Sequence, residues 1–247
     1  MSRTVFVADL HLSEESVALN RLFERCLDTW QGQIDALYVL GDFFDAWVGD
    51  DDDSEFIRRI KTRLAEFTRH TPVYFLHGNR DFLLGAQFAQ ETGIRLLPET
   101  VAVELYGRRY VLAHGDSLCT DDTAYQAFRL QSHNPLWQQA VLAKPLAERR
   151  LLAGQIRHIS EQRKTAEGKS EMSDATEDGV QALMQHHAAD PMPTLIHGHT
   201  HRPAVHEHIC QTNGLPFARH VLQDWYGEAG GYVSVDADGV HSHPLAL

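Results

Sequence analysis

The chain has 247 residues, of which 43% are hydrophobic and 23% are charged. This length suffices for one large α/β domain with a full core, and a second complete domain is not expected. The formal net charge of −12 excludes a general nucleic-acid binder, which needs a basic surface to displace counterions from phosphates. An anionic substrate would have to be met by metal ions or by a local basic patch.

The cysteines point to a reducing compartment. Cys26, Cys119 and Cys210 form no C-x-x-C pair, so neither a disulfide framework nor a cysteine zinc site is indicated. The segment before Asp9 is too short for the core of a signal peptide, and nowhere do about 20 apolar residues follow one another. We expect a protein that is soluble or that at most lies on a membrane surface.

Apolar runs alternate with amphipathic segments along the first half of the chain, which is typical of an α/β protein. The short apolar runs predict buried strands, and the longer segments between them predict helices. The predicted elements are, in order, a strand over 4–8, a helix over 14–30, a strand over 36–40, a helix over 54–69, a strand over 72–76, and strands over 101–105 and 109–113 joined by a hairpin. Further strands are predicted from Leu195 and over 217–222 and 232–235.

Polar residues stand where several of these strands end. The segment from Leu195 to Pro203 is an apolar run that ends in His197-Gly198-His199-Thr200-His201. Because loops at the carboxyl ends of strands in parallel sheets converge on one crevice, such residues should meet there. The candidate ligands at the strand ends are Asp9 with His11, Asp42, Asn79, His114, and His197 with His199.

This set of side chains predicts a metal centre. Imidazole, carboxylate and amide oxygen without thiolate suit Mn(II), Fe(II) or Zn(II) better than a structural zinc site. The ligands are too many for one ion, and Asp42 is placed to bridge two ions. By contrast, the acidic run Asp50-Asp51-Asp52-Asp53 is interpreted as a solvated loop leading into the helix over 54–69, not as a metal site.

The order Asp-x-His, Gly-Asp, Gly-Asn, His-Gly, Gly-His-x-His resembles the calcineurin-like metallophosphoesterase superfamily. The resemblance implies an α/β fold, a four-layer αββα sandwich with two divalent ions at the strand ends. Carried over by motif, the ligands of one ion are Asp9, His11, Asp42 and His199. Those of the other ion are Asp42, Asn79, His114 and His197.

Arg80 departs from many members of the superfamily, which have a histidine directly after the Gly-Asn motif. That histidine is thought to protonate an alkoxide leaving group, whereas arginine stays charged near neutral pH and binds phosphate oxygens. A leaving group that is itself a phosphate needs little protonation. Arg80 therefore favours cleavage of a pyrophosphate, and we expect Arg80, Asp42 and Asn79 to be catalytic.

Longer motifs over 41–51, 78–85, 114–122 and 197–203 are similar to those of the UDP-2,3-diacylglucosamine diphosphatase family of the lipid A pathway. This resemblance implies water attack at the α-phosphorus of a lipid-linked sugar nucleotide, which yields UMP and 2,3-diacylglucosamine 1-phosphate. It also implies two Mn²⁺ ions per chain and a cytoplasmic protein bound peripherally to the inner membrane; we expect a monomer without a nucleic-acid partner. The implied substrate residues are Asn79, Arg80, Asp122, Ser160, Lys164, Lys169 and His197.

A helical insertion over 121–190 is expected within the single domain 1–247, where it would cover the metal crevice as a lid. Pro135 and Pro145 should interrupt its helices. Its apolar residues would either pack the insertion onto the core or form a groove for acyl chains. Between Lys144 and Lys169, seven basic residues outnumber three acidic ones. This basic patch is either a solvated face or a surface for pyrophosphate and anionic lipid.

Two other functions remain open from the sequence. A water-soluble nucleotide phosphatase with the same metal core would cleave simple nucleotides and would be indifferent to acyl chains. A scaffold protein that kept the fold without catalysis would be expected to have lost ligands, whereas every motif ligand is present here.

Overall fold

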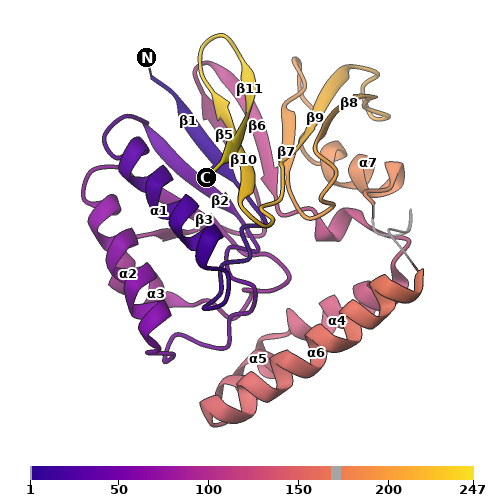
Figure 1. Ribbon diagram of the computed structural model, residues 1–247. Helices are drawn as coiled ribbons and strands as arrows, with labels where there is room; N and C mark the ends of the chain where they lie inside the picture. The colour runs from indigo at the N-terminus through magenta and orange to yellow at the C-terminus, as the bar shows by residue number, and fades with distance from the viewer. Residues whose placement is uncertain (1, 168–173) are drawn as a thin grey trace.

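Two β-sheets lie at the centre of the fold, with helices on their outer faces (Figure 1). The structure is a computed structural model that describes residues 2–167 and 174–247. Strands β1 to β4 pair in parallel in the first sheet, and β10 and β11 extend this sheet in the antiparallel sense. The first sheet has the order β11-β10-β1-β2-β3-β4, and the second has the order β5-β6-β7-β9-β8.

All of the predicted strands are present, together with β4, β8 and β11, which the sequence does not predict. The strands of the first sheet are β1 (Thr4–Val7), β2 (Ala36–Leu40), β3 (Val73–Leu76), β4 (Arg95–Leu96), β10 (Ala229–Val235) and β11 (Val240–Ala246). Those of the second sheet are β5 (Thr100–Leu105), β6 (Arg108–Ala113), β7 (Thr194–His197), β8 (Ala204–Ile209) and β9 (Pro216–Val221). Every residue of β2 is buried because both faces of this strand are covered, which explains why its apolar run predicts its bounds correctly.

Three hydrophobic clusters separate four layers. Helices α1 (Val17–Trp30), α2 (Glu55–Thr68) and α3 (Ala86–Thr92) pack on the outer face of the first sheet. Residues such as Phe6, Tyr38 and Tyr110 form the cluster between the two sheets. Helix α7 (Glu177–Gln185) covers the second sheet through Val180 and Met184. The predicted four-layer αββα sandwich is therefore confirmed.

Local hydrogen bonds set the starts of the first two helices. Helix α1 begins at Val17, three residues later than predicted, because Ser13 and Ser16 form a turn in which the Ser16 N–H donates to the Ser13 carbonyl at 3.2 Å. Helix α2 begins directly after Ser54, whose side chain accepts from the Ile57 N–H and so caps the helix. The predicted helix over 54–69 is confirmed.

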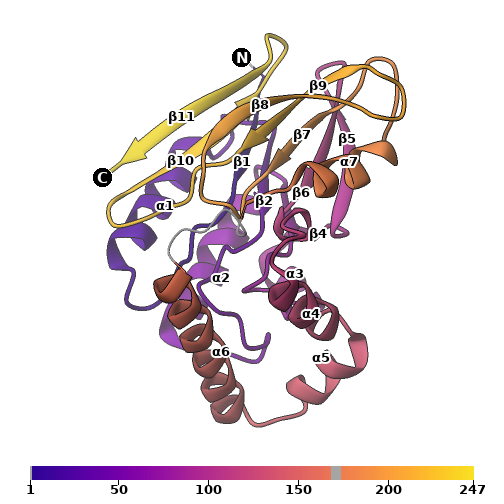
Figure 2. The ribbon, with the colours of Figure 1, turned by 90° about the vertical axis from the view of Figure 1, so that its right-hand side faces the viewer.

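Three helices between β6 and β7 project away from the sheets (Figure 2). They are α4 (Thr123–Ser132), α5 (Pro135–Leu142) and α6 (Leu146–Glu167). Pro135 is the first residue of α5, and Pro145 directly precedes α6, so both prolines mark helix starts. Helix α7 also falls within 121–190 but packs on the second sheet. Among the described residues, no helix is long and apolar enough to cross a membrane.

The acidic run joins the core to the projecting helices. The prediction of a solvated loop is wrong in part, because Asp52 is buried and pairs with Arg150 of α6 at 2.9 Å. Asp51 is exposed but pairs with Arg149 of the same helix. Asp50 accepts from the backbone N–H groups of Gly85 and Phe88. The run therefore anchors α6 and α3, and part of the basic patch is used in these ion pairs.

Candidate active site

The candidate ligands meet at the seam between the two sheets. The loops that follow β1, β2 and β3 come from the first sheet, and those that follow β6 and β7 come from the second. Hydrogen bonds cross the seam: His114 Nδ1 contacts the Leu40 carbonyl at 2.8 Å, and the His199 N–H donates to Asp9 Oδ2 at 2.8 Å. The two sheets together position the site.

Five polar residues of the site have backbone angles in the left-handed region. Their φ values are 55° for Asp9, 49° for His11, 50° for Asp42, 67° for His199 and 53° for His201. Non-glycine residues rarely adopt positive φ, and such strained residues cluster at functional sites. The surrounding contacts hold these residues in conformations that would otherwise be unfavourable.

Glycines allow the site loops to approach one another closely. A Cβ atom at Gly78 would lie 2.2 Å from Asp42 Oδ1, and one at Gly198 would lie 2.3 Å from Asp9 Oδ2. Asp81, which is fully buried, accepts from the N–H groups of Phe43 and Gly78 and so ties two of these loops together. Glycine is therefore required on both sides of the carboxylates.

One group of potential metal ligands consists of Asp9, His11 and His201, whose nearest ligand atoms all lie within 4.8 Å of one another. His201 Nε2 lies 3.4 Å from His11 Nε2 and 3.5 Å from Asp9 Oδ1. Among the residues that the structure describes, Asp9 Oδ1 and His11 Nδ1 are buried and have no hydrogen-bond partner. A buried carboxylate oxygen and a buried ring nitrogen left unpaired are what a cation would satisfy.

A second group consists of Asp9, Asp42 and His114, again within 4.8 Å of one another. Asn79 Oδ1 lies 3.0 Å from His114 Nε2 and 2.9 Å from His199 Nδ1. Asp9 belongs to both groups, so the two groups are contiguous. Carboxylate, amide oxygen and imidazole suit a divalent ion of the Mn(II), Fe(II) or Zn(II) class. These residues fit the predicted metal centre.

The charges of the site follow from its burial. Burial raises the pKa of Asp42 to about 7. Burial also disfavours protonation of His114, but the carboxylates of Asp42 and Asp9 outweigh this effect and raise its pKa to about 9. Burial alone would raise the pKa of Asp9, yet the His201 imidazole 3.5 Å away and the other nearby imidazoles hold it well below its usual range. The site thus brings several ionisable side chains together away from solvent.

The histidines at the end of β7 and in the loop after it lie differently from the ligand set that the motif implies. His197 is fully buried, and its ring nitrogens contact the Gly198 carbonyl at 2.8 Å and Arg219 Nη1 at 3.1 Å. His199 lies beside Asn79 and His114, while His201 lies beside Asp9 and His11. His201 is missing from the predicted ligand set, although the His-x-His-x-His alternation contains it. The full ligand assignment stays a prediction.

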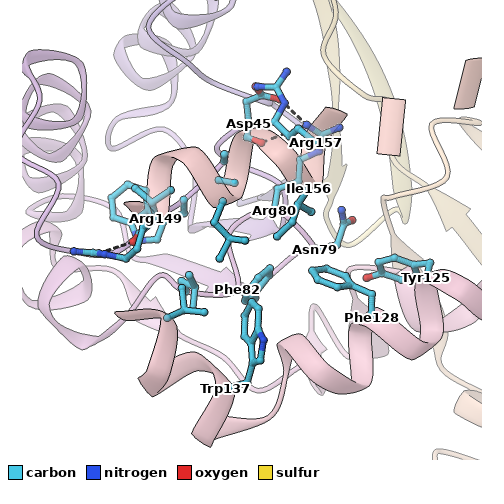
Figure 3. A pocket seen from close by; sticks show the side chains of 17 residues that line it. Asp45, Asn79, Arg80, Phe82, Tyr125, Phe128, Trp137, Arg149, Ile156 and Arg157 are labelled. Carbon is cyan, nitrogen blue, oxygen red and sulfur yellow. Dashed lines mark hydrogen bonds and ion pairs between the residues drawn. The ribbon is translucent and has the colours of Figure 1, made fainter. Parts of the chain in front are cut away.

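A pocket adjoins this centre and runs between the core loops and the projecting helices (Figure 3). Its volume, counted with its opening to solvent, is about 840 Å³. Asp45, Asn79, Arg80 and Arg157 form its polar end. The rest of its lining is mainly apolar and includes Phe82, Leu83, Phe128, Trp137, Val141, Leu152 and Ile156. The pocket therefore joins a charged end near the centre to an apolar end under the helices.

Some predicted substrate residues lie at this pocket and others elsewhere. Asn79 and Arg80 line it, whereas the Asp122 side chain caps α4 by accepting from the Tyr125 N–H at 2.9 Å. Ser160 and Lys164 belong to α6, but their side chains lie outside the described part of the structure, as does Lys169 altogether. Tyr125, which sequence reasoning missed, lines the pocket and donates to Asp116.

Comparison with known proteins agrees with this geometry. The family model of the calcineurin-like phosphoesterases matches residues 2–203. The chain belongs to this family. It is 50% identical to a "UDP-2,3-diacylglucosamine hydrolase" of Chromobacterium violaceum over 97% of this chain and 98% of the relative. It is 46% identical to a protein of the same name from Escherichia coli, over 96% of each chain.

A solved structure supports the fold. An archaeal phosphodiesterase, described as novel, superposes with a TM-score of 0.51 at 10% sequence identity and covers 99% of each chain. At this identity the likeness concerns the fold alone. It agrees with the two-sheet sandwich and its flanking helices.

Proposed function

We propose that this calcineurin-like phosphoesterase hydrolyses the pyrophosphate of UDP-2,3-diacylglucosamine by water attack at the α-phosphorus, giving UMP and 2,3-diacylglucosamine 1-phosphate in lipid A biosynthesis. Relatives of that name at 46–50% identity support the substrate. The observation that carries the proposal is the pocket, whose polar end lies at the candidate metal centre and whose apolar remainder extends under α4–α6. A phosphate linked to acyl chains requires this combination.

The metal centre is proposed to hold two Mn²⁺ ions. Asp9, His11, Asp42 and His199 would hold one ion, and Asp42, Asn79, His114 and His197 the other, with His201 beside the first. The bound ions would supply Lewis-acid stabilisation of the phosphoryl oxygens and a water nucleophile at neutral pH. The unpaired buried atoms of Asp9 and His11 support a cation beside these two residues.

Arg80 is proposed to bind the phosphate that undergoes attack. Its guanidinium lies at the polar end of the pocket, with Nε 3.5 Å from Asp42 Oδ2. It cannot donate a proton to the leaving group near neutral pH, but it neutralises charge that develops on the phosphate oxygens. Since the leaving group is itself a phosphate, this neutralisation suffices. Asn79, next to Arg80, would orient the same group from its amide.

The helices α4–α6 are proposed to form the lid that receives the acyl chains, within the insertion over 121–190. Phe82 of the core and Trp137 of α5 both line the pocket and contact each other, with ring centroids 6.1 Å apart. Leu152 and Ile156 of α6 complete the apolar wall. This lining supports the groove interpretation of the insertion's apolar residues.

The same helices are proposed to contact the cytoplasmic face of the inner membrane, which would make the protein a peripheral one. Large apolar side chains are exposed on each of the three helices: Leu130 is 76% exposed, Leu136 74% and Leu151 69%. Exposed leucines beside a pocket for a lipid substrate would bury apolar surface in a bilayer. We further propose a monomer, which analytical ultracentrifugation would test.

The deciding experiment is UMP release from UDP-2,3-diacylglucosamine in detergent, with and without Mn²⁺, compared with UDP-glucose and p-nitrophenyl phosphate. We expect Mn²⁺-dependent release from the acylated substrate and little turnover of the others. Equal cleavage of the soluble compounds would contradict the proposed substrate and leave a general phosphoesterase. Full activity after chelation of metal would contradict the metal centre.

A further inference from the structure

One carboxylate holds two arginines at the polar end of the pocket. Asp45 lies on the loop after β2, Arg80 on the loop after β3, and Arg157 on α6. Arg80 Nη1 donates to Asp45 Oδ1 at 2.6 Å, and Arg157 Nη1 donates to Asp45 Oδ2. Figure 3 shows the three side chains together at one end of the pocket. Each oxygen of the carboxylate therefore accepts a hydrogen bond from a different guanidinium group.

This arrangement places two permanent positive charges where a diphosphate would lie. The two phosphates of a diphosphate together offer more acceptor oxygens than a carboxylate and carry more negative charge in total. A diphosphate would therefore replace Asp45 between the two arginines. We infer that Arg157 is a phosphate-binding residue for the diphosphate substrate, and that Asp45 occupies its guanidinium until the substrate arrives. This inference rests on the proposed function.

The alternative is that Arg157 only fastens the lid to the core. Two other arginines of α6 already do so. Arg149 has only 3% of its side chain exposed, and it donates to the Val48 carbonyl and to Asp51. Arg150 pairs with Asp52, and its side chain is 52% exposed, close to the 43% of Arg157. Of Arg150 and Arg157, only Arg157 lines the pocket. Arg150 is therefore the matched control.

The two roles of Arg157 predict opposite effects of Asp45→Asn on ligand binding. If the pair only fastens the lid, Arg157→Ala and Asp45→Asn break the same contact and should change ligand binding in the same direction. If Arg157 binds phosphate, Arg157→Ala should weaken binding, whereas Asp45→Asn should strengthen it because a neutral amide competes less well for the guanidinium. Because Asp45 also pairs with Arg80, the gain from Asp45→Asn must disappear in the Arg157→Ala background if it comes from Arg157. The sign of the Asp45→Asn effect and its loss in that double variant together separate the two roles.

The experiment measures the affinity of 2,3-diacylglucosamine 1-phosphate, in detergent with Mn²⁺, and of inorganic pyrophosphate by isothermal titration calorimetry. We expect Arg157→Ala to raise Kd about tenfold, equivalent to about 1.4 kcal/mol, and Asp45→Asn to lower it roughly threefold, with Arg150→Ala unchanged. Arg157→Lys should recover part of the loss because it retains the charge. The KM for the acylated substrate should follow Kd more closely than kcat does.

Two outcomes would overturn the inference: Arg157→Ala binding like Arg150→Ala, or Asp45→Asn and Arg157→Ala weakening binding together. Metal content, measured by plasma mass spectrometry, should not change in any of these variants. If the unaltered chain released no UMP from UDP-2,3-diacylglucosamine, the proposed function would fail. Opposite effects of the two variants on pyrophosphate affinity would still support Arg157 as a phosphate-binding residue.

Discussion

Arg149 is expected to be the main attachment of the lid, and its removal should cost far more stability than removal of its neighbour. Replacement by alanine leaves the Val48 carbonyl, which accepts from Arg149 Nη1 at 2.6 Å, without this donor in a buried place. An unsatisfied buried carbonyl costs about 1–3 kcal/mol. Lost packing of the arginine stem adds about 1 kcal/mol. Asp51 returns to water at little cost because 59% of its side chain is exposed.

The expected loss for Arg149→Ala is therefore about 3 kcal/mol, which in a domain of this size lowers Tm by roughly 6–10 °C. Arg150→Ala removes a half-exposed partner of the buried Asp52, but Asp52 still accepts from the Ser54 N–H at 3.0 Å, so this change should cost only about 1 kcal/mol. Thermal unfolding followed by circular dichroism, with both variants at the same pH and salt, measures the difference. Equal shifts in Tm for the two variants would refute the reasoning from burial.

Three further predictions concern the site. Asp42→Ala should abolish nearly all turnover and reduce bound metal, measured by plasma mass spectrometry; full activity without added metal would refute the two-ion assignment. Arg80→Ala should lower kcat while metal stays bound, and an unchanged rate would leave Arg80 only a structural partner of Asp45. Mn²⁺ affinity should rise from about pH 6 to about pH 9, because binding requires Asp42 without its proton and neutral His114. Burial raises the pKa of Asp42 to about 7, and the neighbouring carboxylates raise the pKa of His114 to about 9. Calorimetry should detect proton release on Mn²⁺ binding, and a pH-independent affinity would contradict the raised pKa values.

The sequence predicts the elements whose faces are fully covered. β2 is predicted residue for residue because its apolar run has no polar interruption. The sequence does not predict β8 and β11 because these strands lie at the edges of the sheets. None of their residues is buried, so no continuous apolar run marks them. β4 has only two residues, too few for any pattern.

The site was predicted as a group of strand-end residues, but not in its detailed contacts. Sequence spacing brings Asp9, Asp42 and His114 to one edge, and the structure places them within 4.8 Å of one another. The position of each histidine after β7 depends on positive φ angles at His199 and His201, which spacing alone does not encode. The pairing of Asp45 with Arg157 joins residues far apart in sequence, so it could be found only in three dimensions.

Because the candidate ligands come from both sheets, the affinity for metal should depend on the position of one sheet relative to the other. Asp9, Asp42 and Asn79 move with the first sheet, whereas His114 and the histidines after β7 move with the second. A small slide of one sheet along the other would separate ligands without unfolding either half. A conservative change in the interface between the sheets, such as Ile196→Val, would thus alter metal occupancy at a cost in stability of only about 0.5–1.5 kcal/mol. Selection on metal binding would then act on side chains that never touch an ion.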